Sequence, residues 1–178
     1  IILCENDPHS VDILKEQLPQ NRQVVFAIPD VITSNSAPEF LLKNDQLSVV
    51  TERGEIFVDE RVSFLKGEMH FISENDLIHK QWAAKLYLHN TPHCIAAYMG
   101  ALVGAKYVHE AMAVPEVAAI VEGSMNEMLA SLKARWDIPH DFLDWYAEKE
   151  LSRFSCKLLF DPISRVAREP LRKLELDG

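Results

Sequence analysis

The sequence predicts an α+β fold that is mostly helical, in which a small antiparallel sheet precedes a helical bundle. Residues 22–72 hold short runs of β-branched and aromatic residues separated by Pro, Asn, Asp and Gly, a pattern typical of strands and turns. From Asp76 onward the apolar residues instead recur at helical spacing. With 178 residues, 48% of them hydrophobic, the chain is long enough to bury one core.

The first residues predict the end of a different domain. Residues 1–4 form an unbroken apolar run that stops at the polar turn 5–8, as in a strand buried on both faces of a parallel sheet. No second βαβ unit is evident, so we expect the neighbours of this strand outside the chain. Residues 1–8 are therefore predicted to close an upstream α/β domain and residues 9–178 to form the next domain, truncated at both ends. The alternative is a free-standing domain whose first strand pairs with its own later strands.

Turn residues and apolar spacing predict the next elements in chain order. A short helix is expected over residues 9–18, and Pro19 ends it. The strands of the small sheet are expected within residues 22–72, at positions 24–28, 47–51 and 56–58.

Helices are predicted throughout residues 73–178, with prolines near several of their starts. Ser73 or Asp76 is expected to cap the first helix. Pro92 removes a backbone donor, so we expect the helix to kink or restart there with Thr91 as the new N-cap. Further helix starts are expected near Pro115, Pro139, Pro162 and Pro170, with Pro115, Pro162 and Pro170 at first-turn positions.

The composition excludes several classes of function. A formal net charge of −9 has the wrong sign for a protein that binds a phosphate backbone, so no nucleic-acid partner is expected. No apolar run approaches the roughly 18 residues of a membrane helix and no signal-like start is present, so we expect a cytoplasmic protein without a membrane partner. The three cysteines form no C-x-x-C pair, which argues against a disulfide framework or a cysteine zinc site.

The glycines and histidines exclude two further kinds of site. The six glycines never fall as G-x-G, so the chain has neither a dinucleotide fingerprint nor a phosphate-binding loop. His89 and His93 are four positions apart but lack the glutamate of H-E-x-x-H, so no metal is expected. Gly100 and Gly104 lie in an almost wholly apolar stretch and are expected to let helices approach closely.

Lys85 is the first residue whose position suggests chemistry. It follows Trp82 by three positions, which places it on the apolar stripe of a helix. Its stem could pack on the stripe while the ammonium reaches water, or desolvation could lower its pKa and make it a general base. Asn90 and His93, five and eight positions further on, could face the same cleft. Taken singly, they are typical of a helix cap and of a core histidine.

Together these residues resemble a known family. Lys85-x4-Asn90-x2-His93 resembles the K-x4-N-x2-H signature of the polyol-specific long-chain dehydrogenases. Residues 4–6, Cys-Glu-Asn, are similar to the C-[DE]-N that ends the last strand of the family's nucleotide domain. Residues 88–100 and 165–174 resemble two segments of its mannitol-1-phosphate 5-dehydrogenase branch, L-N-T-G-H-x-I-x-A-Y-L-G and R-V-x-R-x-P-L-R-K-L.

The resemblance implies a metal-independent enzyme that moves a hydride between a polyol and a nicotinamide cofactor. It implies that Lys85 is the general base, that Asn6 and Asn90 donate hydrogen bonds to the developing alkoxide, and that His93 binds and orients the substrate oxygen. Glu5 and Asn6 would lie beside the cofactor, NAD or NADP, which the chain's own upstream Rossmann domain would mainly hold.

Two departures from the family pattern affect this assignment. Pro92 replaces the usual Gly of the signature stretch. Asp30 matches a substrate-binding position of the family, but Val31 follows it where the mannitol-1-phosphate branch typically has Arg. The second departure affects the details of substrate recognition.

Basic residues near the C-terminus bear on the substrate. Seven of the chain's 18 lysines and arginines lie in its last 30 positions, and Arg168, Arg172 and Lys173 are the candidate anion ligands. The alternative is a solvated face neutralised by nearby glutamates. We predict interconversion of a hexitol phosphate, mannitol 1-phosphate, and a ketohexose phosphate, fructose 6-phosphate. The alternatives are a hexuronate reductase acting on fructuronate or tagaturonate, a mannitol 2-dehydrogenase, and a non-catalytic helical interaction module.

Overall fold

The structure is a computed structural model that describes residues 1–4, 7–34, 36–42 and 47–171. The chain divides into two compact units. The first comprises Ile1–Val31 and Arg53–Ala83, and the second comprises Ile32–Glu52 and Ala84–Gly178. Among the described residues, no helix is long and apolar enough to cross a membrane.

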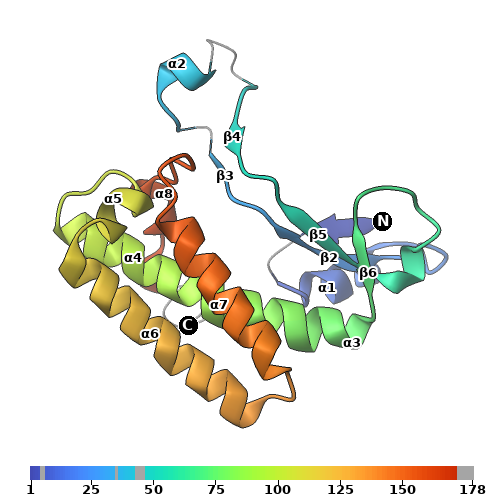
Figure 1. Ribbon diagram of the computed structural model, residues 1–178. Coiled ribbons are helices and arrows are strands. Elements are labelled where there is room, and N and C mark those ends of the chain that lie inside the picture. Colours follow the sequence, from blue (N-terminus) through green and yellow to red (C-terminus); the bar gives the residue numbers. More distant parts are fainter. Residues whose placement is uncertain (5–6, 35, 43–46, 172–178) are drawn as a thin grey trace. The chain divides into compact units, whose positions relative to one another are not determined.

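The first unit is built on a four-stranded mixed sheet (Figure 1). Across the sheet the strands are β1 (Ile2–Cys4), β2 (Val25–Asp30), β5 (Glu55–Asp59) and β6 (His70–Ile72). The β1–β2 and β5–β6 pairs are parallel, and only the central β2–β5 pair is antiparallel. The helix α1 (Ser10–Gln17), predicted over residues 9–18, connects β1 to β2.

Successive side chains of β2 point to opposite faces of this sheet, and both faces are packed against other residues. Phe26 packs with Val11 of α1 and with Leu77 on one face, while Val25 packs with Val58 of β5 on the other. The short η1 (Glu60–Val62) follows β5, and α3 (Glu74–Asp76) and the π-helical η2 (Leu77–Trp82) follow β6. Ser73 caps α3 as predicted, because its hydroxyl accepts a hydrogen bond from the backbone N–H of Asp76 at 3.1 Å.

Two expectations about the sheet need correction. The sheet was predicted to be antiparallel, but two of its three strand pairs are parallel. We also expected no second βαβ unit, whereas β1, α1 and β2 form one within the chain. The crossover was not recognised because α1 has only eight residues and a single buried one, Val11. That residues 1–8 close an upstream domain stays a prediction, and Glu5 and Asn6 lie outside the described residues.

The second unit is a helical bundle, which confirms the predicted mostly helical α+β class (Figure 1). Its helices are α4 (Thr91–Leu102), α5 (Val108–Met112), α6 (Pro115–Arg135), α7 (His140–Phe154) and α8 (Ile163–Val166). The central α4 packs against α5, α6 and α8, while α6 packs against α7. The buried side chains include Met125 and Leu132 of α6 and Leu143 and Tyr146 of α7.

Prolines mark the helix starts largely as predicted. Pro115 is the first residue of α6, and Pro139 immediately precedes α7. Pro162 lies one residue earlier than predicted, at the N-cap of α8 instead of its first turn. Pro170 is helical, and the residues after position 171 lie outside the described part.

A strand pair and a short helix belong to the second unit as well. β3 (Thr33–Ser34) pairs antiparallel with β4 (Val50–Thr51), and α2 (Glu39–Leu42) lies between them in the chain. The hydroxyl of Ser34 donates to the carbonyl of Phe160 at 2.9 Å, and the hydroxyl of Tyr107 donates to the carbonyl of Ser36 at 3.0 Å. These bonds hold the segment against the helical residues of the same unit.

The predicted break at Pro92 is wrong. Residues 85–90 form the π-helical η3 (Lys85–Asn90), and the helix continues directly into α4. Thr91 has helical dihedral angles, with φ −65° and ψ −57°, so it is not an N-cap. Its hydroxyl donates to the carbonyl of Leu86 at 3.2 Å. The wider π turn accommodates the proline ring, which would clash with the carbonyl four residues back in a regular α-helix.

The two glycines of α4 have different roles. A Cβ on Gly100 would lie 2.7 Å from the Cβ of Ala111 and 2.5 Å from Cδ1 of Ile163, which confirms close helix contact. Gly104 has no such neighbour within 4 Å in the described part of the chain, so the same expectation is wrong there. Its φ of +75° makes it the left-handed residue that ends α4. The N–H of Ala105 donates to the carbonyl of Gly100 at 2.9 Å and completes that helix end.

Candidate active site

The three residues of the predicted signature lie on one helical segment. Lys85 and Asn90 are the first and last residues of η3, and His93 is the third residue of α4. A π turn closes its hydrogen bond five residues along, so it brings Lys85 and Asn90 closer to one face than a regular α-helix does. Both side chains are partly exposed, whereas His93 is buried. The π winding therefore supports the predicted common face.

His93 is the most tightly enclosed of the three. Its ring stacks on Phe154 of α7 with 5.1 Å between centroids and 5° between planes. Nε2 lies 2.8 Å from Oδ2 of Asp161. Burial lowers the pKa of His93 to about 4, against the raising effect of the Asp161 carboxylate. The imidazole is therefore neutral at pH 7.

Asp161 is buried and held from two sides. Its Oδ1 accepts hydrogen bonds from Nε of Arg165, at 3.1 Å, and from Nη2 of the same guanidinium. Burial works to raise the pKa of Asp161, but the contacts with His93 and Arg165 outweigh it and keep the pKa below its usual value. Asp161 is a carboxylate at neutral pH.

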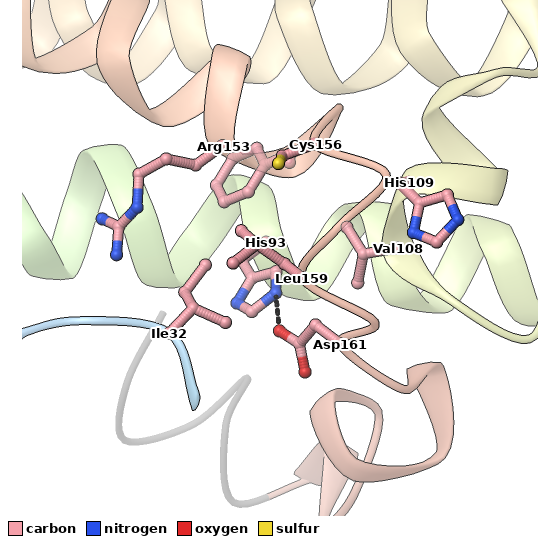
Figure 2. A pocket seen from close by; sticks show the side chains of 9 residues that line it. Ile32, His93, Val108, His109, Arg153, Cys156, Leu159 and Asp161 are labelled. Atoms are coloured by element: carbon pink, nitrogen blue, oxygen red, sulfur yellow. Dashed lines mark ion pairs between the residues drawn. The ribbon is translucent and has the colours of Figure 1, made fainter. Parts of the chain in front are cut away.

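A small pocket adjoins this pair (Figure 2). About 10 Å³ of it is available to the centre of a water molecule, which is room for about one oxygen atom. His93 and Asp161 contribute polar atoms to its wall, together with Arg153 and His109. The remaining lining residues are Ile32, Val108, Phe154, Cys156 and Leu159.

A buried ionic network lies beside the site. Nδ1 of His89 is 2.5 Å from Oε2 of Glu150, and Oε1 of Glu150 accepts from Nη1 of Arg153 at 2.6 Å. Arg153 continues to Glu52, whose Oε2 accepts from Nε at 3.3 Å. Oε1 of Glu52 in turn accepts from the backbone N–H of Ile32 at 2.7 Å. The network ties η3, α7 and the β3–β4 segment together.

Neither this network nor the contact between Asp161 and His93 was predicted from the sequence. Glu52 and Arg153 are 101 positions apart, so no local pattern could connect them. A local signal did exist for Asp161, because Arg165 follows it by one helical turn, the spacing of an ion pair. His89 and His93 also approach each other, with 4.9 Å between ring centroids.

The other predicted site residues are distributed more widely. Asp30 ends β2 in the first unit, where it is buried and pairs in register with Glu55 of β5. Arg168 belongs to the second unit and is exposed. The predicted residues Glu5, Asn6, Arg172 and Lys173 lie outside the described residues. In the described part of the chain, no group of three or more His, Cys, Asp and Glu residues is arranged to hold a metal ion.

Comparison with known families decides the relationship. The family described as the mannitol dehydrogenase C-terminal domain matches residues 78–177, more than half of the chain. The chain belongs to this family. The match spans η3, α4 and the C-terminal segments, so it includes the Lys85, Asn90 and His93 signature on which the predicted resemblance rested.

Relatives of known activity agree with the mannitol dehydrogenase assignment. A mannitol-1-phosphate 5-dehydrogenase of Caldanaerobacter subterraneus subsp. tengcongensis is 30% identical over 185 positions, covering 98% of this chain and 48% of the relative. The chain thus spans about half the length of this curated relative.

Two solved structures share the fold of this mannitol dehydrogenase family member. Mannitol 2-dehydrogenase of Pseudomonas fluorescens, in a ternary complex with NAD and D-mannitol, matches with a TM-score of 0.70 and 20% identity, covering 93% of this chain and 38% of that one. A D-sorbitol dehydrogenase in substrate-free form matches with a TM-score of 0.67 and 19% identity, covering 93% and 36%.

Proposed function

We propose that this chain is the substrate domain of an NAD-dependent, metal-independent polyol dehydrogenase that interconverts a hexitol phosphate and a ketohexose phosphate. The observation that carries the proposal is the placement of Lys85, Asn90 and His93 on one π-to-α helical segment. Membership of the mannitol dehydrogenase family supports the reaction class. The name of the mannitol-1-phosphate 5-dehydrogenase relative supports the phosphorylated substrate.

In this proposal Lys85 takes the proton of the reacting hydroxyl. The Lys85 side chain is only half-buried, so it can exchange that proton with water. The side-chain amide of Asn90 donates a hydrogen bond to the oxygen as negative charge develops on it. His93, neutral and fixed by its stacking on Phe154, orients the same substrate.

NAD, when bound, supplies the acceptor for the hydride that leaves the carbinol carbon. The chain has no G-x-G fingerprint, so a nucleotide-binding domain preceding it in the full-length protein would hold most of the cofactor. Asn6 would reach the reacting oxygen from that side, and Glu5 would lie beside the cofactor. NADP remains an alternative to NAD, because the discriminating residues of such domains lie after their first strands.

The anionic group of the substrate would be bound by basic residues of the C-terminal segment. We assign this role to Arg168, Arg172 and Lys173, and a further polar contact to Asp30. A guanidinium can bind either a phosphate or a carboxylate in a forked arrangement. A hexuronate reductase is therefore the second candidate, because it would use the same base with a carboxylate at the anion site.

A comparison of four substrates, each measured separately, tests the proposal. The full-length protein is given NADH with fructose 6-phosphate, fructose, fructuronate or tagaturonate, and kcat/KM is measured for each. A strong preference for fructose 6-phosphate supports the phosphate assignment. A preference for a hexuronate moves the anion site to a carboxylate, and a preference for fructose favours a mannitol 2-dehydrogenase. If a folded protein that binds NADH reduces none of the four, the proposed hexitol phosphate substrate is wrong and another ketose is indicated.

A further inference from the structure

We propose that Asp161 and His93 form a subsite that binds a single hydroxyl group of the substrate. Through this subsite, Asp161 selects polyols that carry a hydroxyl group at the matching position. The inference deepens the proposed function and rests on it for the identity of the ligand. The subsite consists of Oδ2 of Asp161, Nε2 of His93 and the small pocket that both residues line (Figure 2).

Two buried polar atoms at this site lack a hydrogen-bond partner. Nε2 of His93 and Oδ2 of Asp161 are 2.8 Å apart and form an ion-pair contact, but among the described residues neither atom has a partner in hydrogen-bond geometry. The residues are only 7% and 4% exposed, so bulk water does not satisfy these atoms. Leaving a buried donor or acceptor unsatisfied is costly, and such atoms point to a missing partner.

The pocket has the size of that partner. About 10 Å³ is available to the centre of a water molecule, which corresponds to one oxygen atom. With Nε2 carrying the proton of the neutral ring, the site presents one donor and one charged acceptor side by side. A hydroxyl group both accepts and donates, so one hydroxyl, or one water in its absence, satisfies both atoms.

The surroundings hold Asp161 in the state that this role requires. Arg165 occupies the other carboxylate oxygen, Oδ1, from within hydrogen-bond distance and so leaves Oδ2 for the pocket. Phe154 fixes the plane of the His93 ring. The charged and titratable groups around the pair include Arg165 and His89, and His109, Arg153 and Cys156 line the same pocket. A carbonyl oxygen has no proton to donate to Oδ2, so the site favours a hydroxyl over a carbonyl at this position.

Substrate analogues test the subsite in the full-length protein. Monodeoxy forms of the preferred hexitol are compared in the parent, in Asp161→Asn and in the control Asp144→Asn, whose carboxylate is exposed and pairs with Lys133. We expect Asp161→Asn to lower kcat/KM for the intact hexitol about 10- to 100-fold, as for a lost hydrogen bond to a charged group. For one deoxy position, the parent and Asp161→Asn should become nearly equal, because the missing hydroxyl removes the interaction. If Asp161→Asn lowers activity equally on every analogue, or not at all, the subsite is wrong.

A second measurement needs neither turnover nor a variant. A high-resolution crystal structure of the parent without substrate should show an ordered water within hydrogen-bond distance of both Nε2 and Oδ2. A direct, linear hydrogen bond between these atoms with no oxygen beside them would overturn the proposal even if the substrate tests of the proposed function succeed. An ordered water in a protein that reduces none of the ketoses would keep the subsite and reject the function.

Discussion

Nδ1 of His89 lies 2.5 Å from Oε2 of Glu150, although 61 positions separate the two residues in the chain. Glu150 is completely buried, and its other oxygen accepts a hydrogen bond from Arg153. A carboxylate in the interior is strongly destabilising without such partners. The contact between His89 and Glu150 therefore fixes η3 against α7. Because Asn90 follows His89 directly, the same contact helps to position Asn90.

Removing the arginine from this network should be costly. We expect Arg153→Met to lower the free energy of unfolding by about 3–5 kcal/mol, because it removes a charged hydrogen-bond partner from the buried carboxylate of Glu150. The control is Lys133→Met, which breaks the more exposed ion pair with Asp144 and should cost less than about 1 kcal/mol. Urea unfolding of both variants provides the comparison. If Arg153→Met and Lys133→Met lowered the free energy of unfolding by the same amount, the buried network would contribute no more than the exposed ion pair.

Two glycines in helices should respond to alanine in opposite directions. Gly100→Ala places a methyl group against the Cβ of Ala111, an atom that moves only with its backbone, and should destabilise by about 1–3 kcal/mol. Gly123 lies within α6 with open space around it, so Gly123→Ala should stabilise by about 0.5–1 kcal/mol. Thermal unfolding measures both changes. A neutral Gly100→Ala would contradict the close contact between α4 and α5.

The sequence predicted the helices best where periodicity and proline agree. α6 has 21 residues of helical spacing beginning at Pro115, where a first-turn proline was predicted. The sheet was predicted less well, because strand direction depends on which strands become neighbours. Residues 24–28 indicate a strand whether it pairs with β1, in parallel, or with β5, antiparallel.

For the candidate site, the sequence could identify the groups that lie on one helix. Lys85, Asn90 and His93 form a spacing pattern within nine residues. Asp161 lies just before α8, and it contacts His93 because α8 packs against α4. The spacing of residues along the sequence does not show this contact. The π winding of η3 was likewise not predictable, and Pro92 was read as a break because the proline rule assumes a regular α-helix.

Acid should destabilise the protein through His93. Burial lowers its pKa in the folded state to about 4, while the unfolded chain titrates near the ordinary value of 6.5. Between these values the unfolded state binds more protons, so stability falls with falling pH, by at most about 1.4 kcal/mol per pH unit from this group. The lowered pKa of Asp161 adds a loss of the same sign in stronger acid.

Urea unfolding from pH 7.5 to 4.5 measures this dependence. His93→Gln should flatten the curve, because glutamine does not titrate. His140→Gln alters an exposed histidine at the start of α7 and should leave the slope as it is in the parent. Parallel curves for the parent and His93→Gln would show that His93 is not the buried neutral group described above.

The central claim, that Lys85 is the general base of a polyol dehydrogenase, is tested most directly by kcat of Lys85→Ala in the full-length protein, with the exposed Lys157→Ala as control. We expect kcat to fall about 100- to 10,000-fold, the usual contribution of general acid–base catalysis, with NADH binding and unfolding free energy close to those of the parent. Lys157→Ala should behave like the parent. Near-parental turnover by Lys85→Ala, or loss of its fold, would contradict the claim.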